Sequence, residues 1–158
     1  MILIYAISWQ QTSFNNMAKY VKPTLDTKFH IDFAWWQKQS QNLDAYLQSH
    51  LCPEARAVHV NDNQNQRLDW VNPETGEVFQ INMLWHTIQT HCSQQSDFID
   101  ESMPITRAIF RLFIANDNIP LTPLEIHEKL QKKNPDLILR TIGGHQVYEG
   151  IRPVSLSI

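Results

Sequence analysis

Residues 119–144 read IPLTPLEIHEKLQKKNPDLILRTIGG, and this stretch contains two helix starts. The Thr-Pro-Leu-Glu segment at 122–125 is the pattern of a capping box with proline at the first helical position. The Asn-Pro pair at 134–135 repeats the cap-plus-proline signal, and the Gly-Gly pair at 143–144 ends the second helix. The stretch therefore predicts two short helices separated by a tight polar turn.

A further helix is predicted just upstream of this stretch. Pro104 is followed by apolar residues at helical spacing, and the Asn-Asp-Asn segment at 116–118 would end the helix. Its apolar positions are Ile105, Ala108, Ile109, Leu112 and Phe113. Downstream, residues 146–154 predict a short pair of strands with Gly150 at the bend.

Three helices, a tight turn between the second and third, and a trailing β-ribbon resemble the winged helix-turn-helix superfamily. The resemblance lies in the caps and apolar positions of residues 104–158. It implies that the third helix enters the major groove of DNA and presents polar side chains to base edges.

The third predicted helix departs from that pattern. Its sequence, Asp136-Leu-Ile-Leu-Arg-Thr-Ile142, offers only Arg140 and Thr141 as base readers, and Asp136 would repel phosphate. At least one Leu or Ile of this helix is left exposed, which suits a protein partner better than DNA. The basic residues nearby are either a phosphate-contacting set or ordinary surface charges. They are Lys132, Lys133, Arg140, His145 and Arg152.

Composition changes along the chain. The 158 residues carry a formal net charge of −3, and 42% are hydrophobic, as in folded globular proteins. Residues 1–103 contain six basic and eleven acidic side chains and all five Trp, whereas residues 104–158 contain seven basic and five acidic ones. This predicts an aromatic-rich N-terminal domain over 1–103 and a winged-helix-like domain over 104–158. Neither has the strong positive charge of a dedicated nucleic-acid binder.

The first half of the N-terminal part predicts a strand and a long helix. Residues 1–9 are apolar on both faces of a strand, which is typical of a strand buried in a sheet or against a partner chain, and residues 10–28 show no clear period. Residues 33–51 carry a helical apolar stripe about five turns long, with Asp32 as N-cap, which Pro53 ends.

The second half predicts a β-hairpin and another helix. Residues 67–81 carry β-branched and aromatic residues on two arms, and the Asn-Pro-Glu-Thr-Gly segment at 72–76 supplies the turn. Residues 83–95 predict a helix followed by a polar, acidic connector. Its inner stripe comprises Leu84, Ile88 and Cys92.

Two pairs of His and Cys are candidate zinc ligands. His50 and Cys52 lie at the end of one predicted helix, and His91 and Cys92 lie at the end of another. Imidazole and thiolate are zinc ligands, but a structural knuckle would normally show Cys-x-x-Cys, and position 55 is Ala. Cysteine is also often simply buried, so both interpretations stay open.

Trp35 and Trp36 point about 100° apart if both lie on a helix. Trp36 belongs to the apolar stripe, so Trp35 must find a second surface. That surface is either the hairpin or first strand, or a partner protein for which Trp35 is an anchor.

Together these patterns predict an α+β fold, in which a helix-rich N-terminal part with a β-hairpin precedes a winged-helix-like module. We expect a non-enzymatic adaptor or regulator that binds a protein partner, with no cofactor and no membrane span. Two cysteines are too few for a disulfide framework, so a cytoplasmic location is expected. A DNA-binding transcription regulator and a small zinc-stabilised fold are the alternatives, and the oligomeric state stays open.

Overall fold

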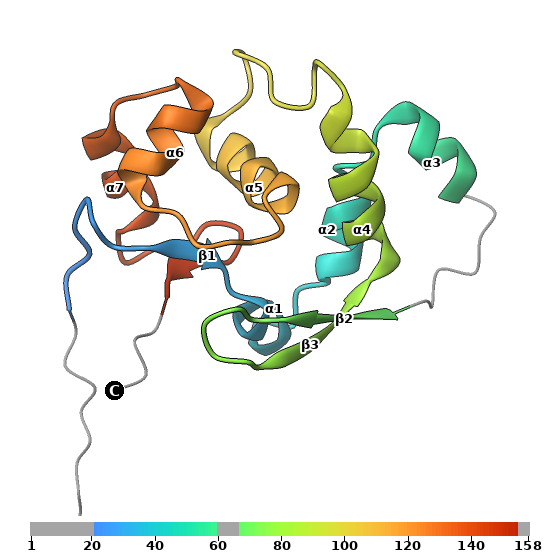
Figure 1. Cartoon of the computed structure of the whole chain (residues 1–158), viewed down its shortest axis with the longest axis horizontal. Helices are drawn as coiled ribbons and strands as arrows, with labels where there is room; N and C mark the ends of the chain where they lie inside the picture. The colour runs from blue at the N-terminus through green and yellow to red at the C-terminus, as the bar shows by residue number, and fades with distance from the viewer. Residues whose placement is uncertain (1–20, 60–66, 155–158) are drawn as a thin grey trace, which may run out of the picture.

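The computed structural model describes residues 21–59 and 67–154, and within them helices and two small antiparallel sheets form an α+β fold, as predicted (Figure 1). In Figure 1, α6 and α7 lie on one side of α5, and α2 and α4 lie on its other side. In chain order the elements are β1 (Phe29–Ile31), α1 (Phe33–Lys38), α2 (Leu43–Gln48), α3 (Pro53–His59), β2 (Arg67–Val71), β3 (Val78–Asn82), α4 (Met83–Thr90), the 3₁₀ helix η1 (Cys92–Gln94), α5 (Ile105–Ala115), α6 (Pro123–Leu130), α7 (Pro135–Ile142) and β4 (Ile151–Pro153).

The three helices predicted after Pro104 are all present. At the start of α6, Thr122 Oγ1 accepts the Glu125 N–H at 3.2 Å, and Glu125 Oε2 accepts the Thr122 N–H at 2.7 Å. This is the capping box that the sequence predicts. At the start of α7, Asn134 Oδ1 accepts the Leu137 N–H at 2.8 Å. The local cap chemistry therefore sets both helix starts.

The predicted strand pair within residues 146–154 is wrong. β4 pairs instead with β1, with Ile31 opposite Ile151 and Phe29 opposite Pro153. The reason is burial: Phe29 and Ile31 of β1 are fully buried, whereas the 146–148 segment that would have formed the other arm is largely exposed. No sequence pattern indicates β1, because its three residues are too few to show a period.

The other edge of β1 is paired as well. The Phe29 N–H donates to the Leu121 carbonyl at 2.8 Å, and the Leu121 N–H donates back to the Phe29 carbonyl at 3.0 Å. Leu121 lies in the connection between α5 and α6. β1 therefore lies between that connection and β4, and both neighbours belong to the C-terminal part of the chain.

The Asn118 side chain holds Ile31, the last residue of β1, by hydrogen bonds. This side chain is fully buried and has two hydrogen bonds with one residue of β1. Asn118 Oδ1 accepts the Ile31 N–H at 2.8 Å, and Asn118 Nδ2 donates to the Ile31 carbonyl at 2.9 Å. The amide thus replaces a strand partner for Ile31. Asn118 has φ of 56°, a left-handed conformation that Asn tolerates better than most residues.

The long helix predicted over residues 33–51 is wrong: the stripe is divided between α1 and α2. Asp32 does cap α1, since Oδ1 accepts the Ala34 N–H at 3.0 Å. Ser40 then takes a left-handed φ of 54°, and Asn42 Oδ1 caps α2 by accepting the Ala45 N–H at 3.2 Å. Ser and Asn favour caps and turns because their side chains compete for backbone groups, so the polar run 39–42 breaks the helix.

The predicted hairpin is confirmed as β2 and β3, with Trp70 opposite Phe79. Gly76 takes a φ of 72° in the turn, and its N–H donates to the Asn72 carbonyl at 2.8 Å. The next helix, α4, ends at Thr90 rather than near residue 95 and continues as η1. Near its end, the Thr90 hydroxyl donates to the His86 carbonyl, a contact that loosens helix ends.

Buried side chains from both sides of Pro104 belong to one hydrophobic cluster. Trp36 of α1 stacks on Tyr46 of α2 with ring centroids 5.2 Å apart, and both rings contact Phe110 of α5. The domain boundary at Pro104 stays a prediction. The predicted strand at residues 1–9 lies outside the described residues. Within 21–59 and 67–154, none of the helices has both the length and the apolar character needed to cross a bilayer.

We expect Asn118→Gly to lower the free energy of unfolding by about 2–4 kcal/mol, because both backbone groups of Ile31 lose a buried partner. Glycine accepts the left-handed φ, so backbone strain does not contribute. Asn118→Asp should also destabilise the protein, because a buried carboxylate oxygen would then face the Ile31 carbonyl oxygen in place of a donor. Urea unfolding measures each value. Asn116→Ala, which removes a bond from a half-exposed amide to the Ile119 carbonyl, is the matched control. Equal losses for Asn118→Gly and Asn116→Ala would contradict the assignment.

Candidate functional site

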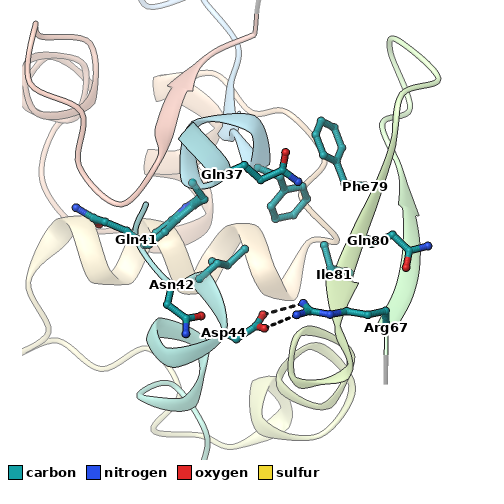
Figure 2. Close-up of a pocket in the computed structure, with 11 residues that line it drawn as sticks. Gln37, Gln41, Asn42, Asp44, Arg67, Phe79, Gln80 and Ile81 are labelled. Atoms are coloured by element: carbon teal, nitrogen blue, oxygen red, sulfur yellow. Dashed lines mark hydrogen bonds and ion pairs between the residues drawn. The ribbon is translucent and has the colours of Figure 1, made fainter. Parts of the chain in front are cut away.

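A pocket of about 310 Å³ lies between the α1–α2 segment and the β2–β3 hairpin. One wall comes from the helix break described above, since residues 37 and 41–44 line the pocket. The hairpin positions the other wall through Phe79 and Ile81 (Figure 2). The two segments that form the pocket are thus a broken helix and a tight hairpin, both of which follow from local sequence.

The base of the pocket is apolar. Phe33 and Ile81 are buried, while Leu43 and Phe79 are half-buried and so remain accessible from the pocket. Phe33 is fixed by aromatic neighbours, since its ring lies 4.9 Å from that of Trp70 and 5.2 Å from that of Trp85, both edge-on. Such packing holds the base rigid while it leaves one apolar strip open to a ligand.

Gln37 supplies an uncharged polar group at the mouth. Figure 2 shows its side chain extended towards Phe79, whereas the side chain of Gln41, which also lines the pocket, points away from Phe79. Gln80 also turns away: it lies on the opposite face of the strand from Phe79 and hydrogen-bonds to Asp69. An amide both donates and accepts hydrogen bonds, so Gln37 can pair with a main-chain amide of a ligand.

A bidentate ion pair closes the other end of the pocket. Arg67 Nη1 donates to Asp44 Oδ1 at 3.2 Å, and Arg67 Nη2 lies 2.9 Å from Asp44 Oδ2. Figure 2 shows the two parallel contacts between α2 and β2. An exposed pair of this kind adds little to stability, but the fork geometry fixes both side chains at one position.

Two members of the predicted phosphate-contacting set, Lys132 and Arg152, have side-chain contacts within the chain. Lys132 Nζ donates to the carbonyl oxygens of Glu101 and Met103, at 2.9 and 3.0 Å. Arg152 Nη1 lies 3.0 Å from Asp32 Oδ2. The remaining three residues, Lys133, Arg140 and His145, are exposed. The phosphate-contacting role of this set stays a prediction.

The outer surface of α6 and α7 carries apolar residues. Leu137 of α7 is 37% exposed and Leu124 of α6 is 41% exposed, whereas Ile138 and Ile142 are buried. The prediction that the third helix leaves an apolar residue exposed is confirmed. Asp136 is exposed at the start of the same helix, so this surface combines leucines with charges of both signs.

Trp35 finds its second surface on the loop before β4. Its half-buried ring lies edge-on against Trp36 with centroids 5.3 Å apart. It also lies against Gly150, since a Cβ placed there would be 3.1 Å from Trp35 Cε3. Of the surfaces proposed for Trp35 from the sequence, the first strand lies outside the described residues. Its role as an anchor for a partner stays a prediction.

The four candidate zinc ligands are not brought together. Cys52 and Cys92 do meet, with their sulfur atoms 2.8 Å apart. His91 Nε2 lies 3.1 Å from Glu54 Oε2, and His50 Nδ1 accepts a hydrogen bond from Arg111 Nε at 3.1 Å. Over residues 21–59 and 67–154, no group of three His, Cys, Asp or Glu side chains is arranged to hold a metal ion.

His50 is instead a buried structural residue. It is 1% exposed, and its ring lies 5.0 Å from that of Phe110 and 4.7 Å from that of Tyr46. Burial, with smaller contributions from the positive charges of Arg107 and Arg111, lowers the pKa of His50 to about 3. The imidazole is therefore neutral at physiological pH, which lets Nδ1 accept from Arg111.

Sequence reasoning missed the pocket because it treated residues 33–51 as one straight helix. The signal that could have found it was the polar run Gln39-Ser-Gln-Asn42, which contains a cap residue in front of a second apolar group. The hairpin wall was predicted, but nothing local indicated that it would face the helix break.

Lowering the pH should destabilise the protein through His50. The folded state resists protonation of His50 down to about pH 3, whereas the unfolded chain takes up the proton near pH 6.5. The contribution of neutral His50 to the free energy of unfolding is thus fully present above pH 6.5. It is lost as the pH falls towards 3, with a slope of about 1.4 kcal/mol per pH unit for this proton. Denaturant unfolding at several pH values should show a flatter slope for His50→Gln. An unchanged slope would contradict the assignment.

We expect Gly150→Ala to destabilise the protein more than Gly76→Ala. Both glycines have positive φ, 74° and 72°. A Cβ on Gly150 would lie 2.4 Å from Trp36 Nε1, whereas one on Gly76 meets nothing within 4 Å. Gly76→Ala should therefore cost about 1–2 kcal/mol from backbone strain alone, and Gly150→Ala about 1–3 kcal/mol more from overpacking. Thermal unfolding of both variants tests the difference, and equal losses would refute the close contact.

Comparisons of the chain with models of protein families, with curated proteins and with solved structures found no match.

Proposed function

We propose that this protein is a non-enzymatic adaptor or regulator that binds an extended segment of a partner protein in the pocket between α1–α2 and the hairpin. The observation that carries the proposal is the composition of that pocket. Half-buried apolar side chains line its base, an amide lies at one end and a fixed ion pair at the other. We further propose the cytoplasm as its setting, where Cys52 and Cys92 would remain reduced.

Each part of the pocket matches a feature of a polypeptide segment. Leu43 and Phe79 offer accessible apolar surface for one side chain of the partner. Gln37 can both donate to and accept from the partner's main chain. The Asp44–Arg67 pair retains unused donor and acceptor positions that can meet a charged or polar side chain. A partner with one apolar residue beside a polar main-chain stretch fits this arrangement.

The surface of α6 and α7 supports a protein partner over duplex DNA. Lys132 and Arg152 already have partners within the chain, so their contribution to phosphate binding is reduced. Leu124 and Leu137 are exposed where a DNA-reading module would present polar groups. Lys133 and Arg140 are the exposed cations of α7 and the turn before it.

Selection of random peptides by display on the immobilised protein tests the proposal. A selected peptide, measured by fluorescence anisotropy, should bind Gln37→Glu at least about fivefold more weakly, the size of loss seen for a contact that matters in an interface. Gln94→Glu is the matched control, because it makes the same exposed substitution on η1. Arg140→Ala should also leave peptide binding unchanged.

Two outcomes would overturn the proposal. One is a set of selected peptides that bind Gln37→Glu and the unchanged protein equally well. The other is tight binding to duplex DNA at low salt that weakens on Arg140→Ala, which would favour the DNA-binding alternative.

A further inference from the structure

Cys52 and Cys92 come from separate parts of the chain and meet side by side. Cys52 lies directly before α3, and Cys92 begins η1 just after α4. The Cys92 thiol donates to Cys52 Sγ over a sulfur–sulfur distance of 2.8 Å. The Cys52 N–H also donates to Cys92 Sγ at 3.1 Å, so the backbone at Cys52 is held against the second sulfur.

The two thiols differ in access. Cys92 is completely buried, whereas Cys52 is half-buried and can be reached by a small solute. Burial, together with the hydrogen bond to Cys52, raises the pKa of Cys92 to about 11. An oxidant from solution therefore meets Cys52 first, and Cys92 lies behind it in contact with the sulfur that has reacted.

We propose that Cys52 and Cys92 form a reversible intramolecular disulfide when the protein meets a peroxide. In the first step the Cys52 thiol is oxidised to a sulfenic acid, and the peroxide is reduced, releasing one water from hydrogen peroxide. In the second step Cys92 sulfur attacks Cys52 sulfur, the S–O bond breaks, and the hydroxyl leaves with the Cys92 proton as a second water. A dithiol reductant reverses the reaction by thiol–disulfide exchange.

The geometry favours this pair over other fates of an oxidised cysteine. The sulfur atoms must approach from 2.8 Å to the bond length of about 2.05 Å, a movement smaller than an ordinary side-chain adjustment. The bond would join the residue before α3 to the first residue of η1 and close a loop between residues separated by 40 positions. A cross-link over a loop of this length restricts the unfolded chain and raises the melting temperature.

Mass spectrometry of the full chain tests the proposal. The protein is treated with hydrogen peroxide, denatured, and alkylated with N-ethylmaleimide. The expected product has lost two hydrogen atoms, carries no alkyl group on either cysteine, and recovers both alkylation sites after reduction with dithiothreitol. The oxidised protein should also melt about 5–10 °C higher than the reduced protein.

Cys52→Ser is the control variant, because it retains the buried Cys92 and changes a half-exposed position. It should show neither the mass loss nor the rise in melting temperature after the same treatment. Three results would overturn the proposal: both thiols remaining alkylatable after treatment, a disulfide-linked dimer as the oxidised product, or sulfinic acid at Cys52 with a free thiol at Cys92.

Discussion

The side chain of Asn118 replaces a missing strand partner, and the arrangement of the rest of the structure depends on this contact. Because its amide satisfies both backbone groups of Ile31, this residue of β1 can lie buried beside the end of α5 without an unpaired backbone group. Leu121 and β4 then complete the two edges of β1. Asp32 follows directly and starts α1, so the position of the aromatic core and of the pocket is set from this strand.

The pocket follows from a second constraint, the break between α1 and α2. A continuous helix over residues 33–51 would have carried Leu43 and Asp44 along a straight axis. The left-handed Ser40 and the Asn42 cap instead redirect α2 so that Asp44 reaches Arg67 of β2. The same break lets Trp36 stack on Tyr46, which closes the core behind the pocket. The polar run 39–42 thus produces both the pocket and the stacked Trp36 and Tyr46 rings behind it.

The sequence predicted the helix caps and the hairpin turn, but it did not predict the pairing of strands that are distant in the chain. The caps at Thr122 and Asn134 and the turn at 72–76 act within a few residues, so their patterns predicted α6, α7 and the hairpin. β1 has partners about 90 and 120 positions away in the chain, and no local pattern marks a three-residue strand. The sequence identified Cys52 and Cys92 as candidate zinc ligands. It could not show that His50 and His91 bind other partners, because those partners are distant in the chain.

The pairing of β1 with β4 also determines how the molecule would respond to mechanical force. The Val154 N–H donates to the Lys28 carbonyl, so the chain enters and leaves the ladder at the same end. A pull on residues 28 and 154 in opposite directions would load the hydrogen bonds one after another, as in a zipper, rather than all together in shear. The β1–β4 ladder would then be the first part of the fold to separate under tension.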